Sequence, residues 1–183
     1  MMSFLVAFLA CAGTLSAALA LYYWQLGDQN ILFDIGAVQD LLVQHDPERG
    51  EIICRCSIPL TNRGEQQGMV NNVFCQPVYC GKIMKGMEIR SQINVVKEQA
   101  RENGYWESLI LKKDAYFLTQ LEVRIRHSSV DIPTLIRQVP RLTIIIYYQV
   151  VGRKGIQWKL AELPLPLKDA QLPAKLKEEK VVE

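Results

Sequence analysis

Histidine, the residue that general acid-base catalysis uses most often, is scarce: the 183-residue chain contains only His45 and His127. Neither lies in a motif beside a nucleophile. The segment from His127 to Asp131 contains the residue types of a catalytic triad, but consecutive residues cannot adopt that geometry, because triad members come from separate elements. GxSxG, GxGxxG, HExxH and Walker A patterns are also lacking. We therefore expect no enzymatic activity, no catalytic residues and no cofactor.

An excess of charge of one sign is lacking as well. Lys and Arg number 21 against 19 Asp and Glu, a net charge of +2, so the overall field gives no reason to expect a nucleic-acid partner. With 49% hydrophobic and 22% charged residues, 11 Gly and 8 Pro, the chain is not collagen-like, disordered or a coiled coil. This composition is typical of one globular domain with a short additional segment.

The N-terminal segment contains no charged side chain before Asp28. The apolar run from Ser3 to Trp24 is long enough to cross a hydrocarbon core of about 30 Å as a helix. Tyr22, Tyr23 and Trp24 end this run as an aromatic belt at the membrane interface. We predict a transmembrane anchor over residues 1–27 and a single-pass membrane protein.

Two processed forms compete with a retained anchor. Ala18-Leu19-Ala20 fits a signal-peptide cleavage site, but the segment before it lacks Lys and Arg and the apolar run continues beyond it. The residues before Cys11 do not match those of a lipoprotein signal. The favoured interpretation is that Cys11 is a small apolar residue in a helix. Small residues between Ala10 and Ala18 would also allow close contact with another helix.

The distribution of charged residues near the anchor bears on which side of the membrane the soluble part lies. The first basic residue is Arg49, so the distribution of Lys and Arg does not decide it. Residues 28–51 contain six acidic residues against Arg49 alone, and an anionic cytoplasmic leaflet would repel them. This favours an extracytoplasmic domain, while the cytoplasmic orientation stays open.

Strand-like alternation dominates residues 28–165, which we predict to be one domain. In the segment from Glu51 to Leu60, apolar residues alternate with Glu51, Arg55 and Ser57, as in a half-buried strand. The segments expected to be extended are Ile31–Gln44, Glu51–Leu60, Met69–Tyr79, Met87–Val96, Trp106–Leu111, Tyr116–Arg126, Arg141–Val151 and Ile156–Leu165. The fold class is therefore mainly β, an antiparallel β-sandwich, with a small β-barrel as the alternative.

Turn and cap signals separate these strands. Residues 152–155 indicate a hairpin turn, and Asp131 is expected to cap a short helix that contains Pro133 and runs to Val139. Pro77 indicates an edge or a bulge, and residues 97–104 read as a loop. Residues 166–183 are polar and are predicted to be a flexible tail.

The end of one strand, Leu60-Thr61-Asn62-Arg63-Gly64, followed by a second strand, resembles the first half of many immunoglobulin-like domains displayed behind a single membrane helix. The resemblance implies an immunoglobulin-like fold and leaves activity open. The Cys-Trp-Cys pattern of antibody domains is absent, because residues 141–151 contain no Cys.

Four cysteines form the most distinctive set: Cys54, Cys56, Cys75 and Cys80. If the strands flanking Gly64 formed a hairpin, Cys54 and Cys75 would lie opposite each other and a disulfide would be possible; in separate sheets that pairing would fail. Buried free thiols are the favoured interpretation, ahead of disulfides and of a metal site.

Basic residues gather in the second half of the chain. Residues 112–159 contain nine Lys and Arg against three acidic residues. A solvated sheet face is the favoured interpretation. The alternative is a docking surface for an acidic partner, formed by Lys112, Lys113, Arg124, Arg126, Arg153 and Lys154.

Together these signals predict a single-pass, membrane-anchored binding or scaffold protein, an accessory component of a membrane or envelope complex with a protein partner. One alternative is a redox or metal-binding accessory protein that uses the cysteines. The other is a domain that binds lipid or an anionic surface.

Overall fold

The computed structural model describes residues 2–46, 49–78, 86–96 and 108–169. A long helix, α1 (Met2–Gln25), precedes the strands, and a short helix, α2 (Ile132–Gln138), lies between the seventh and eighth strands. Single 3-10 turns cover Ile35–Ala37 and Leu167–Asp169. The strands within the described residues are β1 (Ile31–Phe33), β2 (Gln39–Asp46), β3 (Glu51–Asn62), β4 (Gly68–Val78), β5 (Met87–Val95), β6 (Leu109–Leu111), β7 (Tyr116–His127), β8 (Arg141–Gly152) and β9 (Gly155–Pro166).

These strands form two antiparallel sheets. Sheet A has the order β1-β3-β7-β5. Strands β1 and β2 pair with the same edge of β3, β1 at its C-terminal end and β2 at its N-terminal part. Sheet B has the order β6-β4-β8-β9. The prediction of a mainly β chain with antiparallel sheets behind an N-terminal apolar helix is therefore confirmed.

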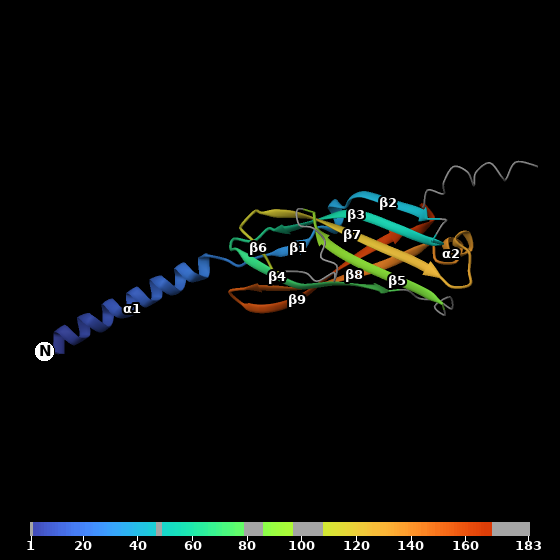
Figure 1. The fold of residues 1–183 in the computed structure, drawn as a ribbon. Coiled ribbons are helices and arrows are strands. Elements are labelled where there is room, and N and C mark those ends of the chain that lie inside the picture. Colours follow the sequence, from blue (N-terminus) through green and yellow to red (C-terminus); the bar gives the residue numbers. More distant parts are fainter. Residues whose placement is uncertain (1, 47–48, 79–85, 97–107, 170–183) are drawn as a thin grey trace, which may run out of the picture.

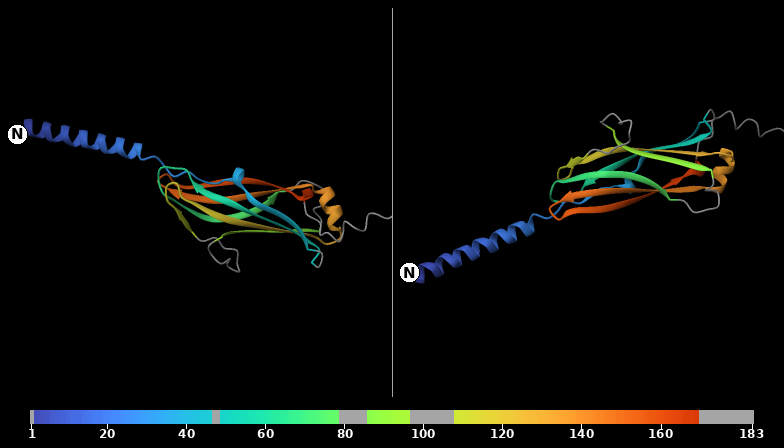
Figure 2. Two further views of the ribbon diagram at one scale, coloured as in Figure 1. Left: turned by 90° about the horizontal axis from the view of Figure 1, so that it is seen from above. Right: turned by 60° about the horizontal axis from the view of Figure 1, so that its bottom comes forward.

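The hydrophobic core takes side chains from both sheets. Along β3, Ile52, Cys54, Cys56 and Ile58 are buried while the residues between them are half-buried, and β8 shows the same alternation. Figure 2 shows the sheets as two layers, and their buried residues belong to a single cluster. Because burial of one such side chain contributes about 1.5–3 kcal/mol, this cluster is the main force that holds the layers together.

Two local signals, a hairpin turn and a helix cap, are confirmed. Gly152 pairs with Gly155 as β8 turns into β9, which confirms the hairpin. Asp131 caps α2, because its carboxylate accepts a hydrogen bond from the Thr134 amide at 3.3 Å, and Pro133 lies in the first turn. These features depend on a few adjacent residues, so sequence alone predicts them well.

The edge predicted at Pro77 is confirmed, whereas the predicted tail needs correction. Pro77 lies opposite Ile144 of β8, and β6 pairs with β4 only over Gly68–Val70, so within the described residues the other side of β4 is an edge at Pro77. The bulge in β4 falls earlier, between Asn71 and Phe74. Leu167 is 1% exposed and belongs to the core, so the predicted boundary at residue 165 excludes a residue that packs with the domain. Residues 170–183 of the predicted tail, residues 97–104 and Trp106 lie outside the described residues.

Helix α1 projects from one end of the two layers, and the strands extend away from it lengthwise (Figure 1). Within Phe4–Gln25, an 18-residue window has a mean hydropathy of 2.2, and none of that window is buried against the rest of the chain. Its length and composition are sufficient to cross a bilayer.

Candidate binding surfaces

The linker between α1 and β1 is fixed to the loop between β3 and β4. Gln66 donates a side-chain hydrogen bond to the Leu26 carbonyl at 2.9 Å. The amide of Glu65 donates to the Asp28 carbonyl, also at 2.9 Å. Gly27, with φ of +66°, provides the left-handed conformation that commonly ends a helix. The chain therefore leaves α1 along a defined path.

Asn62, at the end of β3, connects this linker to the rest of the fold. Its Oδ1 accepts hydrogen bonds from the amides of Asn30 and Gly64, each at 3.1 Å. Its Nδ2 donates to the carbonyls of Gln66 at 2.8 Å, Lys112 at 3.1 Å and Leu111 at 3.2 Å. The side chain is 1% exposed, so it replaces water for backbone groups from three segments.

Two cations in the β8–β9 turn contact the end of α1 and the linker that follows it. Arg153 Nη1 donates to the Tyr23 carbonyl at 2.9 Å and to the Gly27 carbonyl at 3.3 Å, and its guanidinium lies 5.6 Å from the Tyr23 ring centroid. Lys154 Nζ lies 2.5 Å from an Asp28 carboxylate oxygen. A cation at the C-terminal carbonyls of a helix is favourable, so this turn stabilises the junction between helix and domain.

The six basic residues predicted as an alternative docking surface lie in three separate places in the structure. Lys112 and Lys113 lie in the β6–β7 turn beside Asn62, and Arg153 and Lys154 lie in the β8–β9 turn. Lys113 is paired with Glu65, and the β8–β9 pair is used at the junction. Arg124 and Arg126 project instead from β7, on sheet A. The six therefore do not form one continuous surface.

The outer face of sheet A is charged and largely paired within itself. Glu122 accepts hydrogen bonds from the Nε atoms of Arg55 and Arg124, both at 2.7 Å. Arg124 also lies 3.6 Å from Glu51. Partial burial raises the pKa of Glu122, but the hydrogen bonds from the two arginines outweigh it and lower this pKa overall. This face has the character of a solvated, ion-paired sheet surface.

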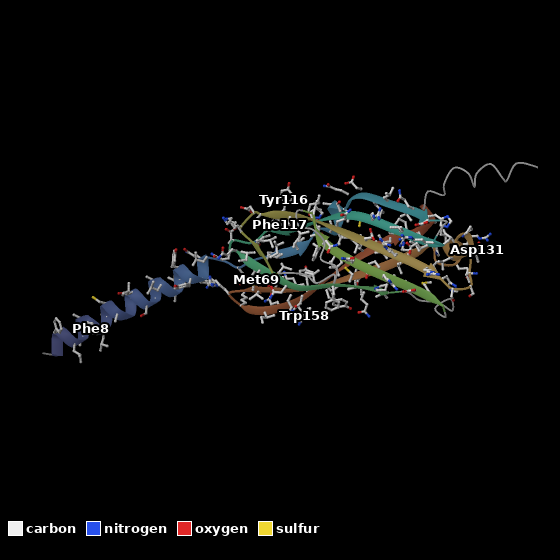
Figure 3. All side chains as sticks on the ribbon, viewed as in Figure 1. Phe8, Met69, Tyr116, Phe117, Asp131 and Trp158 are labelled. Atoms are coloured by element: carbon white, nitrogen blue, oxygen red, sulfur yellow. The ribbon has the colours of Figure 1, made fainter. Side chains whose placement is uncertain are left out.

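The outer face of sheet B has the opposite character. Six large apolar side chains project from β4, β6, β8 and β9, and five of the six have exposed fractions between 49% and 66%. Figure 3 shows Trp158 on the lower side of this layer, away from sheet A. We call this surface the apolar face and define it by Phe74, Ile110, Tyr147, Ile156, Trp158 and Leu160.

Three aromatic rings form the middle of the apolar face. Phe74 stacks on Tyr147 with centroids 5.1 Å apart, and Trp158 meets Phe74 edge-on at 6.1 Å. Aromatic side chains that are packed together yet open to solvent are typical of protein interfaces. This surface was not among the sequence-based predictions. The available signal was β9, where Ile156, Trp158 and Leu160 alternate with smaller or polar residues.

Four cysteines lie in the described residues and all are free: Cys54 and Cys56 are buried, Cys75 is half-buried, and Cys11 is exposed on α1. Cys54 and Cys56 project from β3 of sheet A, whereas Cys75 projects from β4 of sheet B. The hairpin that would have placed Cys54 opposite Cys75 is therefore wrong. Burial raises the thiol pKa of Cys54 to about 12, of Cys56 to about 11 and of Cys75 to about 12. Cys80 lies outside the described residues.

These raised pKa values predict slow alkylation in the folded protein. At pH 8, a thiol with a pKa of about 11 is ionised about 100-fold less than one with an unshifted pKa, and only the thiolate reacts. Iodoacetamide at pH 8 should modify Cys54, Cys56 and Cys75 at least about 100-fold more slowly in the native chain than in urea, as followed by peptide mass spectrometry. Equal rates in the two conditions would contradict the burial of these thiols.

The remaining titratable residues do not assemble a site in the part of the chain that the structure describes. No three or more His, Cys, Asp or Glu residues gather there in a way that could hold a metal ion. His127 has a local structural role, because its Nδ1 accepts hydrogen bonds from the amides of Ser129 at 3.1 Å and Val130 at 3.0 Å. Tyr22, Tyr23 and Trp24, predicted at the membrane interface, are exposed at the end of α1.

Comparison with known proteins gives structural likenesses only. No family model and no curated protein sequence matches the chain. A protein from Bordetella pertussis described as ApaA has 14% identity and a TM-score of 0.42, over 78% of this chain and 97% of that one. The GAE domain of GGA2p from Saccharomyces cerevisiae has 12% identity and a TM-score of 0.32, over 76% and 89%. The yeast GGA1 GAE domain has 9% identity and a TM-score of 0.31, over 69% and 100%. These likenesses assign neither a family nor a function.

Proposed function

We propose that the chain is a single-pass, membrane-anchored, immunoglobulin-like β-sandwich that acts by binding a protein partner, as an accessory or scaffold component of a membrane or envelope complex. The apolar face is the binding surface. Helix α1 is the anchor, and the soluble part lies on the extracytoplasmic side.

The strand order supports the immunoglobulin-like sandwich. In sheet A, the spatial order β1/β2, β3, β7, β5 corresponds to strands A, B, E and D of the immunoglobulin fold. In sheet B, β4, β8 and β9 correspond to strands C, F and G. Strand β6 is an addition at the edge of β4. Two separate sheets over one core also favour a sandwich over the small barrel.

Anchoring is supported by the exposed apolar length of α1 and by the aromatic residues at its end. Three of the six acidic residues that favoured the extracytoplasmic side lie beside a basic residue in the folded chain. Asp28 pairs with Lys154, Asp34 with Arg63, and Glu51 lies near Arg124. Labelling of exposed thiols in intact cells tests the orientation directly.

The contrast between the two outer faces is the observation that carries the binding function. Sheet A presents ion-paired Glu and Arg to solvent, together with Leu42 and Tyr116. Sheet B presents the packed aromatic rings of Phe74, Tyr147 and Trp158 and their apolar neighbours. Monomeric soluble proteins rarely expose a contiguous apolar patch of this kind, and those that do commonly use it to bind. An apolar surface of aromatic residues fits a protein partner.

The two alternatives have less support. Cys54, Cys56 and Cys75 are buried or half-buried and burial raises their pKa values, which is unlike the exposed, low-pKa thiols of redox sites. Of the basic residues near α1, Lys113, Arg153 and Lys154 make contacts within the chain, which reduces their availability to anionic lipid.

The binding function predicts a change in complex size when a charge is placed on the apolar face. Trp158→Lys should shift the protein in mild-detergent membrane extracts to a smaller species on native gels, because an interface tryptophan contributes about 2 kcal/mol or more. Gln120→Lys adds the same charge to an exposed position of β7 on sheet A and is the matched control. If both variants migrate like wild type, the apolar face is not a binding surface.

A further inference from the structure

The apolar face is large enough to form the centre of a protein interface. Half of an aromatic side chain corresponds to on the order of 100 Å², and Phe74, Ile110, Ile156, Trp158 and Leu160 are each about half exposed or more. Together they present roughly 500 Å² of apolar surface, more than half of the about 800 Å² that each partner buries in a standard interface. One extended contact with another folded surface would cover it.

Charge on this face does not oppose contact with an identical face. Polar residues between the apolar side chains are neutral, including Gln76 and Gln149 on β4 and β8. The two charged residues on it in the described chain, Arg141 and Glu162, have opposite signs and lie toward the strand ends remote from α1. A two-fold interface places the same patch on both subunits, so a net charge would repel itself. The apolar face avoids this repulsion, whereas the arginines of sheet A would meet copies of themselves.

The position of α1 makes the apolar face accessible to a neighbour in the same membrane. The helix leaves the domain at the β8–β9 turn, and the strands run lengthwise away from that end (Figure 1). A bilayer crossed by α1 would meet the end of the sheets, and the apolar face would stand upright beside it. The contacts of Arg153 with Tyr23 and of Gln66 with Leu26 hold this arrangement. Two copies anchored side by side can therefore bring their faces together by lateral diffusion.

We propose that the occupant of the apolar face is a second copy of this chain, packed face to face about a two-fold axis parallel to α1. This inference rests on the proposed function, in which the apolar face binds a protein. Gly13 and Ala17, four residues apart on α1, permit close approach of the two helices in such a dimer. Trp158 of each copy then lies near the centre of the interface, where tryptophan contributes most.

Photo-crosslinking of the full-length chain tests this dimer. A photoreactive residue, p-benzoylphenylalanine, replaces Gln76 on the apolar face or, as the matched control, Gln120 on the outer face of sheet A; both positions are exposed glutamines. The protein is irradiated both in cell membranes and after purification into lipid nanodiscs. We expect a two-chain product from position 76, at least tenfold more abundant than from position 120. Trp158→Lys in the same chain should remove it.

The other outcomes separate the two proposals. In one outcome, position 76 crosslinks to a different protein in membranes and gives no crosslinked product in the purified preparation. This result overturns the homodimer and leaves the binding function standing. No product from position 76 in either preparation overturns both. Equal two-chain products from positions 76 and 120 indicate contact through α1 or random collision, and also overturn the face-to-face dimer.

Discussion

Replacing Asn62 with alanine is expected to destabilise the domain by about 3–5 kcal/mol, since several buried backbone groups lose their partners at once. The lost contacts are those of its Oδ1 with the amides of Asn30 and Gly64 and those of its Nδ2 with the Gln66, Leu111 and Lys112 carbonyls. Thermal unfolding of the full chain in mild detergent, followed by circular dichroism, should show a Tm lower by about 10 °C.

Thr61 provides the matched control for this change. It precedes Asn62 on β3, but its buried hydroxyl has no hydrogen-bond partner among the described residues. Thr61→Val should therefore change the free energy of unfolding by less than about 0.5 kcal/mol. If Asn62→Ala and Thr61→Val lower the Tm equally, Asn62 does not organise the junction.

Adding a methyl group at Gly64 should also destabilise strongly, because the linker backbone occupies the space. A Cβ at Gly64 would lie 2.2 Å from the Asn30 nitrogen and 2.3 Å from the Asp28 carbonyl oxygen. The linker would have to move, and the hydrogen bonds between it and the β3–β4 loop would break. Gly64→Ala is expected to cost about 3 kcal/mol or more, measured by the same thermal unfolding.

Gly50 separates this steric effect from the general cost of replacing glycine. It has φ of +60°, and no atom of the described residues lies within 4 Å of an added Cβ, so Gly50→Ala carries only a conformational cost of about 1–2 kcal/mol. A Gly64→Ala variant no less stable than Gly50→Ala would mean that the linker does not pack against the loop as described.

The strands were predictable because their signals are local. Alternation in β3 and β7 sets which side chains face the core, and the short Gly152–Gly155 turn and the Asp131 cap each involve a few adjacent residues. The sheet to which each strand belongs was not predictable, because pairing depends on distant residues. This is why the alternatives for Cys54 and Cys75 stayed open until β3 and β4 were seen in different sheets.

The candidate binding surface was harder to predict than the fold. Strand β8 is apolar on both faces, so its pattern does not show that Tyr147 points outward while Tyr148 is buried. The basic residues looked like one cluster in sequence, but Arg124 and Arg153 lie on different parts of the fold and each is paired within the chain. Asn62 looked like an ordinary turn residue, because its role requires Asn30 and Leu111 to fold beside it.

The most direct test of an anchored domain with an occupied apolar face is thiol labelling in intact cells. Gln76→Cys and Gln120→Cys each place one exposed thiol on opposite outer faces, and the native chain measures the background from its own cysteines. With a membrane-impermeant maleimide, we predict rapid labelling at position 120 from outside and protection at position 76, which mild detergent relieves. Equal labelling at both positions would contradict an occupied apolar face. Labelling at either position only after lysis would contradict the extracytoplasmic orientation.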